Sequence, residues 1–282
     1  MLNNRKVYMN FSTITGFILG IIVIFLGIID FDDLNSGVSI GFQLSKFFDL
    51  SSIAIVFFGT LAATMVNFSF DKIFGVFKVI SNVFKSKKSI ELETAKQLLK
   101  IADEYQKNGP KGLDKLGKNI DDPFIRNAME MIPVESNNER FKSYLDSELK
   151  SMKERHAQGQ EMLYNMGAYA PAFGMLGTVM GLILMMMSQM GNDAMEIDLN
   201  SVLVDMGLAL RTTFYGVILA NLIFIPMAGK LKNMSHQDVY ITEIIIEGLT
   251  CIHRKEHPIL IKDKLSAYLP IELKIKLKKD ST

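Results

Sequence analysis

The chain has 282 residues, of which 49% are hydrophobic, and its formal net charge at pH 7 is +1. This near-neutral balance lacks the surplus of lysine and arginine that favours nucleic-acid binding, so we expect no nucleic-acid partner. Cys251 is the single cysteine, which excludes an internal disulfide bond. The sequence has no glycine-rich phosphate loop, no nucleophile elbow and no His/Cys cluster with metal-ligand spacing, so we expect neither an enzyme nor a bound cofactor.

Four segments are long and apolar enough to cross a membrane, since a hydrocarbon core takes about 20 residues of helix. We expect these spans at about residues 7–29, 50–70, 165–190 and 203–228. The first apolar run is longer than the core of a typical signal peptide and has no clear cleavage site. We therefore expect a retained anchor rather than a removed leader.

Basic side chains near the ends of these segments predict their orientation, because cytoplasmic loops carry an excess of Lys and Arg. Basic residues precede the first span, follow the second and follow the fourth: Arg5, Lys6, Lys72, Lys78, Lys85, Lys87, Lys88, Lys230 and Lys232. The other two connections are acidic, with Asp30, Asp32, Asp33, Asp193, Glu196 and Asp198. Both termini and the long insert are therefore expected in the cytoplasm, with the chain crossing the membrane several times.

The expected fold class is an all-α membrane protein, with four transmembrane helices in two hairpins and a helical cytoplasmic insert between the second and third. The N-terminal transmembrane hairpin occupies 1–70 and the cytoplasmic helical domain 71–161. The C-terminal transmembrane hairpin occupies 162–229, and a cytoplasmic helical tail follows at 230–282. The four histidines are scattered over the expected cytoplasmic segments, and we expect them to be solvated.

The insert carries helical periodicity and helix-terminus signals. Apolar residues at helical spacing over Ile73–Phe84 continue the second span along or below the membrane surface. Ser89 is a good N-cap for the next helix, which we expect to end at Asn108–Pro110. Pro110–Pro123 is expected to be a turn region. Ser136–Glu139 is a capping-box pattern, and the charged helix that it begins is expected to run towards the third span.

The third span has features that a simple lipid anchor does not need. Pro171 lacks an amide hydrogen and frees the carbonyl of Gly167, which must find another partner inside a membrane. Thr178 follows two turns later on the same face, and three glycines, including Gly174, lie in this stretch. This face is typical of a close-packed seam that tolerates polar groups, and it is a candidate ion path.

Charged residues in the spans are few and informative. The first three spans contain no Asp or Glu, although intramembrane carboxylates are the usual carriers of protons and cations. If the chain conducts cations, the titrating carboxylate is expected to come from another polypeptide. Asp205 and Arg211 lie in the fourth span, where a pore-facing or paired placement is favoured. Arg211 would repel a cation nearby unless it pairs with an acid or its side chain extends outward.

The segments Gly167–Thr178 and Leu210–Gly216, with Asn221 and Pro226, resemble the third and fourth spans of the MotA/PomA family, the A subunits of bacterial flagellar stators within the wider MotA/TolQ/ExbB family. The resemblance covers roughly residues 11–270. It implies a homopentamer around two copies of a B-type subunit (MotB/PomB-like) whose single transmembrane helix carries the ion-binding Asp, a 5:2 complex. It also implies that the A ring turns as ions pass and pushes the rotor protein FliG through the insert.

The resemblance also assigns residues to the ion path. Thr178 and Thr213 match two hydroxyls that accompany the ion in sodium-driven members, with Pro171 and Gly174 beside them, so Na+ is favoured over H+ as the transported ion. Hydroxyl oxygens are hard ligands suited to sodium, whereas a proton needs only an acid and a water path. Pro171 and Pro226 match the family's two coupling or gating prolines. The alternatives are that each Thr is a small packing residue and each proline a plain kink.

Two positions depart from the family's pattern. Ala168 stands where sodium-driven members can carry an Asp, which argues against sodium. The basic rotor contact of the insert falls on Gln106, with Lys107 next to it, and the matching acidic contact falls on Asp114. A charged helix face is more often simply solvated, so this alternative stays open.

Two other functions compete with a flagellar stator. ExbB/TolQ-like energisers share the pentameric cation path but have three spans and an outer N-terminus, which the hairpin before the insert disfavours. Another ion-driven motor subunit, for gliding or phage defence, would reuse the same core.

Overall fold

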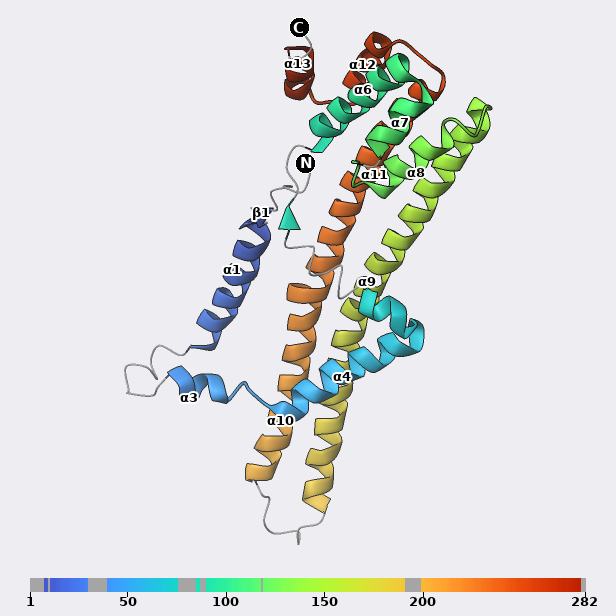
Figure 1. The fold of residues 1–282 in the computed structure, drawn as a ribbon. Coiled ribbons are helices and arrows are strands. Elements are labelled where there is room, and N and C mark those ends of the chain that lie inside the picture. Colours follow the sequence, from blue (N-terminus) through green and yellow to red (C-terminus); the bar gives the residue numbers. More distant parts are fainter. Residues whose placement is uncertain are drawn as a thin grey trace. The chain divides into compact units, whose positions relative to one another are not determined.

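The computed structural model describes residues 8–9, 11–29, 40–75, 85–86, 90–117, 119–190 and 199–279 (Figure 1). Helices form nearly all of the regular structure there, in agreement with the expected all-α class. Two strands of two residues each, β1 (Tyr8–Met9) and β2 (Lys85–Ser86), form a two-stranded sheet.

The chain divides into two compact units. The first, here the membrane unit, comprises Met9–Phe84 and Ala157–Lys232. The second, here the insert unit, consists chiefly of Lys85–His156 and Asn233–Thr282. The insert unit thus combines the central insert with the C-terminal tail, which the sequence had assigned to separate segments.

Four helices in the described residues are long and apolar enough to cross a membrane, as expected. The membrane unit contains α1 (Phe11–Ile28), the short α3 (Ile40–Ser45), α4 (Leu50–Asn67), the second part of α9 (Asn138–Met190), α10 (Leu199–Ile218), the π-helix η1 (Leu219–Phe224) and the first part of α11 (Ile225–His253).

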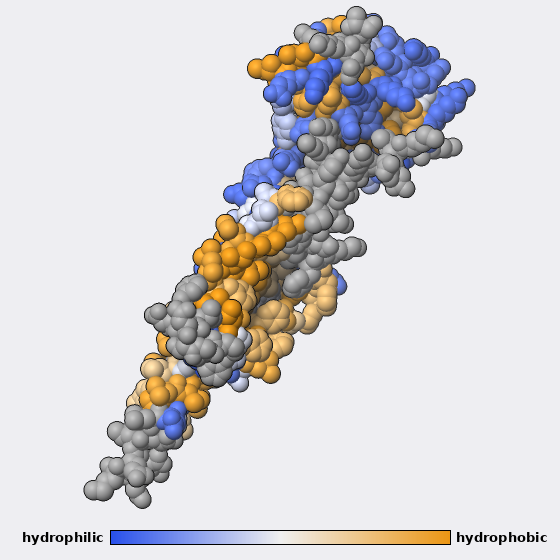
Figure 2. Space-filling model, turned by 90° about the vertical axis from the view of Figure 1, so that its left-hand side faces the viewer, coloured by the Kyte–Doolittle hydropathy of each residue, from blue (hydrophilic) through white to orange (hydrophobic). Residues whose placement is uncertain are grey.

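Large apolar side chains cover the surface of the membrane unit. Helix α1 buries no residue, and Leu19, Val66 and Met186 are 64%, 91% and 65% exposed. Figure 2 shows hydrophobic residues gathered over this unit and hydrophilic residues over the insert unit. A water-soluble monomer rarely exposes so much contiguous apolar surface, so these faces suit lipid or other membrane helices.

Helix α9 is continuous over 53 residues, and Pro171 lies inside it. The charged helix expected to run towards the third span therefore reaches and includes that span. Its N-cap is Asn137, whose Oδ1 accepts hydrogen bonds from the amides of Glu139 (2.8 Å) and Arg140 (3.2 Å). The capping box predicted from Ser136 is wrong by one residue, because Asn caps a helix at least as well as Ser and directly precedes the helix.

The insert unit contains α6 (Ile90–Asn108), α7 (Pro110–Gly117), α8 (Pro123–Met131), α12 (Pro258–Ala267) and α13 (Ile271–Lys279), together with the first part of α9 and the second part of α11. Helix α6 ends where the stop signal predicted, and Gly109 has a left-handed φ of +57°. The proposed N-cap at Ser89 lies outside the described residues, as do residues 76–84 of the predicted helical stretch.

The turn region predicted for Pro110–Pro123 is wrong in its first half, which is the helix α7. Pro110 is its first residue, where a missing amide hydrogen costs nothing. Gly112 packs closely on α6, since a Cβ there would lie 2.8 Å from the carbonyl oxygen of Glu104. Leu113 is 2% exposed, so burial of an apolar side chain stabilises a helix too short to be evident from periodicity.

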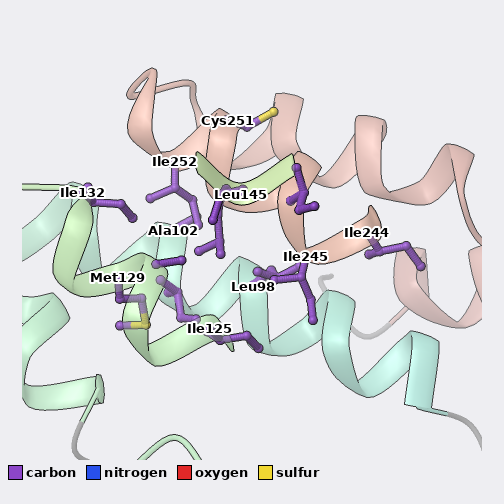
Figure 3. Close-up of a cluster of buried hydrophobic side chains, with 14 of the residues drawn as sticks. Leu98, Ala102, Ile125, Met129, Ile132, Leu145, Ile244, Ile245, Cys251 and Ile252 are labelled. Atoms are coloured by element: carbon purple, nitrogen blue, oxygen red, sulfur yellow. The ribbon is translucent and has the colours of Figure 1, made fainter. Parts of the chain in front are cut away.

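A large hydrophobic core lies inside the insert unit (Figure 3). It is formed by residues of α6, α8, α9 and α11 and by Ile132 directly after α8: Leu98, Ala102, Ile125, Met129, Ile132, Leu145, Ile244, Ile245, Cys251 and Ile252 are all buried. Burial of a large aliphatic side chain contributes about 1.5–3 kcal/mol. His253 is 9% exposed, stacks on Phe141 and contacts the carbonyl oxygen of Glu135 and Oδ1 of Asn138, so the expectation that every histidine is solvated is wrong.

Candidate functional site

Helices α9 and α10 meet along a seam of small residues. A Cβ at Gly177 would lie 2.5 Å from the side chain of Thr212, and one at Gly174 would lie 3.0 Å from the carbonyl oxygen of Thr212. At Gly181 it would lie 2.8 Å from Cβ of Ala209, and at Gly216 of α10 it would lie 2.6 Å from the carbonyl oxygen of Ala170. The backbones therefore approach as closely as glycine permits, and the predicted close-packed seam is present.

The two threonines proposed for the ion path differ in their surroundings. The hydroxyl of Thr213 is half-buried and donates to the carbonyl oxygen of Gly174 across the seam at 3.5 Å, a long hydrogen bond. The hydroxyl of Thr178 is exposed and donates to the carbonyl oxygen of Met175, in the same helix α9, at 2.6 Å. The structure thus brings Thr213 together with Gly174, whereas the hydrogen bond of Thr178 stays within its own helix.

Thr212, which precedes Thr213, is the buried member of the pair. It is 0% exposed, and its hydroxyl donates to the carbonyl oxygen of Ala209 at 2.8 Å. Thr212 is therefore a packing residue of the seam. The sequence raised a pure packing role as the alternative for Thr178 and Thr213, and not for Thr212.

Helix α4 contributes a stripe of hydroxyls that sequence reasoning missed. Ser52, Thr60 and Thr64 are buried with Val56 at four-residue spacing. The hydroxyls of Thr60 and Thr64 donate to carbonyl oxygens four residues earlier, at 2.6 and 2.7 Å. The spacing of small hydroxyl residues along one helical face was the available signal.

The fourth span contains a π-helix that ends two residues before its proline. In η1 the amide of Ile225 donates to the carbonyl oxygen of Ala220, five residues earlier. Pro226 has no amide hydrogen, and its ring would crowd the carbonyl of Leu222 in a regular α-helix. A wider turn relieves this conflict, and such turns are frequent at functional sites. The sequence placed Pro226 as a functional proline but gave no sign of the π-helix.

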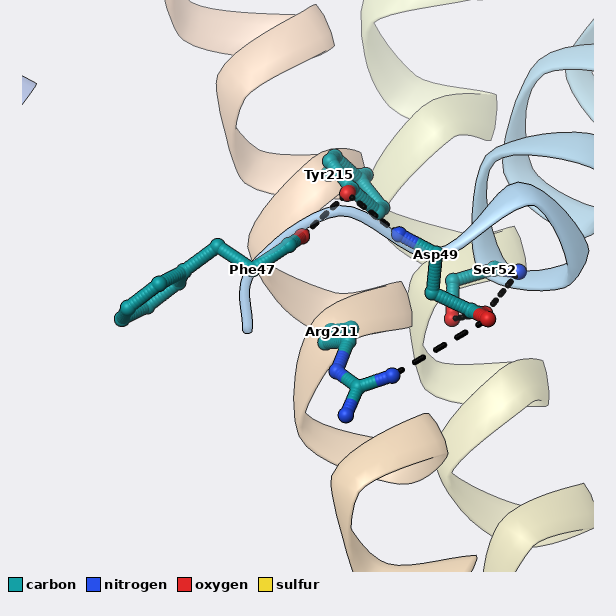
Figure 4. Close-up of polar contacts among 5 residues, drawn as sticks. All are labelled: Phe47, Asp49, Ser52, Arg211 and Tyr215. Atoms are coloured by element: carbon teal, nitrogen blue, oxygen red, sulfur yellow. Dashed lines mark hydrogen bonds and ion pairs between the residues drawn. The ribbon is translucent and has the colours of Figure 1, made fainter. Parts of the chain in front are cut away.

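The charged residues of the fourth span also have defined places. Arg211 Nη1 lies 3.9 Å from Oδ1 of Asp49, so this arginine is paired with an acid (Figure 4). Asp205 is half-buried, and its carbonyl oxygen would lie 2.8 Å from a Cβ at Gly181. Asp49 was not singled out in the sequence, because it precedes the second span and its partner follows far along the chain.

The residues proposed to contact the rotor lie in the insert unit. Gln106 and Lys107 are exposed in the last turn of α6, and Asp114 is exposed on α7. Gln106 also lines a cavity of about 310 Å³ with Ala102, Tyr105, Gly109, Pro110, Ile252, Lys255, Glu256 and Ile261. Because these side chains are exposed, another protein could contact them. A surface that is simply solvated has the same exposure.

Comparison with known proteins relates this geometry to a family. Residues 116–244 match the model of the MotA/TolQ/ExbB proton channel family. The chain is 34% identical over 230 residues to Motility protein A of Treponema phagedenis, covering 82% of this chain and 86% of that one. The chain belongs to the MotA/TolQ/ExbB family. This MotA-type chain is also 32% identical over 259 residues to YtxD of Bacillus subtilis (strain 168), covering 92% and 90% of the two proteins.

A solved structure extends the match to the MotA fold. The flagellar MotAB stator complex from Bacillus subtilis contains a chain similar to this one, with a TM-score of 0.76 and 26% identity over 93% of this chain and 97% of that chain. The all-α fold with four membrane helices and a helical insert is thereby confirmed. Pro171, Gly174, Thr178, Thr213 and Pro226 all lie inside the stretch that the family model matches.

The MotA family is one of channel and stator proteins rather than of known enzymes. Gln106, Lys107 and Asp114 lie before the stretch matched by the family model, so that match does not bear on them. Among the residues that the structure describes, His, Cys, Asp and Glu side chains form no group of three or more that could hold a metal ion.

Proposed function

We propose that this chain is the A subunit of a bacterial flagellar stator, which with a B-type subunit forms a cation channel and couples inward ion flow to rotation. The main observation behind this proposal is the α9–α10 seam. There the hydroxyl of Thr213 donates to the carbonyl oxygen of Gly174, inside the stretch that matches the family model. The names of the relatives, Motility protein A among them, support the same role. Torque would pass through the insert unit to the rotor protein FliG.

The proposed assembly is a pentamer of this chain around two partner helices, lined by α9 and α10. Exposed apolar faces on the membrane unit call for neighbours or lipid, and the first three expected spans supply no carboxylate. The partner would provide the titrating Asp. A purified complex imaged as a dimer, or as a ring with an empty pore, would contradict this arrangement.

The proposed topology places both termini and the insert unit in the cytoplasm. The supporting observation is the distribution of Lys and Arg, which flank the inner ends of the spans. The proposed domain limits remain 1–70, 71–161, 162–229 and 230–282. Labelling of single cysteines, introduced in the acidic connections or in the insert, with a membrane-impermeant reagent in whole cells tests this orientation.

Sodium is the proposed ion, with the proton as the alternative. At about 1.5 Å per residue, Thr178 lies roughly 10 Å along α9 from Pro171, and Thr213 lies roughly 20 Å along the fourth span from Leu199. The two hydroxyls therefore have similar expected depths and can face one partner carboxylate. A cation stripped of water needs each oxygen ligand, whereas a proton is carried by the carboxylate itself.

One experiment tests the function directly. A stator-deletion strain that is complemented with this chain and its neighbouring B-type gene should swim, and its speed should rise with external sodium. Absence of motility in the presence of correctly inserted protein would contradict the flagellar role. Speed independent of sodium but abolished by collapse of the proton gradient would leave the proton alternative.

A further inference from the structure

A polar cluster ties the beginning of α4 to α10 on one side of the membrane unit (Figure 4). Asp49 is the N-cap of α4, and its Oδ2 accepts hydrogen bonds from the amide and the hydroxyl of Ser52, at 2.7 and 2.6 Å. Its other oxygen, Oδ1, lies 3.9 Å from Nη1 of Arg211. The carboxylate of Asp49 therefore caps the N-terminus of α4 and also pairs with the guanidinium of Arg211 on α10.

Tyr215 lies one turn after Arg211 and completes the cluster. Its hydroxyl donates to the carbonyl oxygen of Phe47 and accepts a hydrogen bond of 3.2 Å from the amide of Asp49. The ring of Phe214 packs on that of Phe47 at 5.7 Å between centroids. A single side chain of α10 thus satisfies two backbone groups in the turn that precedes α4.

Arg211 has room for this contact because of a glycine. A Cβ at Gly207 would lie 3.0 Å from Nη2 of Arg211, so the guanidinium extends back along α10 towards the beginning of the helix. Helical side chains normally point in this direction. With the proposed topology, α10 begins at the outer surface, and the arginine therefore extends outward.

The cluster lies on the side of α10 away from the candidate ion ligand. Arg211 and Thr213 are two residues apart, which is about 200° around a helix. Thr213 faces Gly174 in the seam, whereas Arg211 faces Asp49 at the beginning of α4. A helix is only about 10 Å wide, so an unpaired positive charge on one side would still act on a cation at the other.

We propose that Asp49, Arg211 and Tyr215 are positioning residues that hold the beginning of α4 on α10. We also propose that Asp49 neutralises the guanidinium of Arg211, whose positive charge would otherwise oppose the passage of a cation at Thr213. The first role depends on the contacts of the cluster alone. The second rests on the proposed stator function.

Charge-deletion variants separate these roles from simple helix capping. Asn caps a helix as well as Asp does, so Asp49→Asn keeps the bond to Ser52 and removes only the pairing with Arg211. In motile cells, D49N should raise the cation concentration for half-maximal speed about two- to tenfold, with the speed at saturating cation unchanged. The double variant D49N/R211Q should return to within about twofold of wild type. A pure capping role predicts no change in D49N and no dependence on Arg211.

Thermal unfolding of the full chain in detergent tests the clamp without motility. D49N should lower the melting temperature and D49N/R211Q should restore it, because only the single variant leaves a half-buried arginine without its counter-ion. Tyr215→Phe, which keeps the ring and removes the hydroxyl, should also lower it. A wild-type melting temperature in both D49N and Tyr215→Phe, or a D49N defect that persists in the double variant, would overturn the proposal. If the wild-type chain failed to power motility while these shifts held, the stator function would fail and the clamp would stand.

Discussion

Gly177 offers the sharpest test of the α9–α10 seam. An added Cβ would lie 2.5 Å from the Cβ, Cγ2 and Oγ1 atoms of Thr212, and Thr212 is 0% exposed. Carbon atoms in contact normally lie about 3.5–4.0 Å apart, so Gly177→Ala must separate the helices by about 1 Å. Overpacking of this kind typically costs about 1–3 kcal/mol, more than the roughly 0.5–1 kcal/mol that Gly→Ala contributes to helix stability.

The separation should weaken the contact between Thr213 and Gly174, which is already 3.5 Å long. We expect Gly177→Ala to reduce motility strongly and to lower the melting temperature of the purified chain. Gly229→Ala is the matched control, since a Cβ there meets nothing within 4 Å. Thr212→Gly removes all three clashing atoms and should partly rescue Gly177→Ala. Wild-type speed and stability in Gly177→Ala would refute the reasoning.

Three further predictions concern the ion, the rotor and pH. Thr178→Ala should abolish motility in a sodium-driven motor and be tolerated in a proton-driven one; swimming speed against sodium concentration distinguishes the two. Exposed ion pairs contribute only about 0–1 kcal/mol each, so charge reversal of both Lys107 and Asp114 should impair swimming more than either alone while ring assembly stays intact; normal swimming of the double reversal would exclude them as rotor contacts. In the insert unit, a hydrogen bond from Lys264 holds the pKa of Glu256 below its ordinary 4.5. Its stabilising contribution is therefore complete above about pH 4.5 and is lost as pH falls through the lowered pKa. The melting temperatures of wild type and Glu256→Gln should converge below that pH, and a difference that widens on acidification would contradict this.

The four membrane helices could be predicted from the sequence because the signal is local. A charge-free apolar run such as Leu50–Phe70 has few stable structures available to it in a membrane other than a helix. The stop at Asn108 was equally local, since glycine in the left-handed conformation followed by proline ends a helix within a few residues. Helix α7 was missed because its stability comes from the burial of Leu113 and the contact of Gly112 with α6.

The sequence could propose residues for the candidate site but not the contacts that they make. The glycine seam followed from spacing along α9, but which threonine packs and which faces Gly174 depends on the rotation of α10, which sequence does not show. The need of Arg211 for a partner followed from the cost of an unpaired charge in lipid. The identity of that partner, Asp49, required the fold, because the two residues come from separate hairpins.

The π-helix η1 has a consequence for how the fourth span is aligned and engineered. A π turn takes up about one residue more than an α turn, so the residues that follow are rotated by roughly 100° relative to an uninterrupted helix. A helical wheel drawn through the whole span would therefore assign Pro226 and Lys230 to the wrong sides relative to Thr213. Deleting one residue within Leu219–Phe224 would remove the extra residue that the π turn takes up, so a regular α-helix could form while the beginning of α11 keeps its orientation relative to α10.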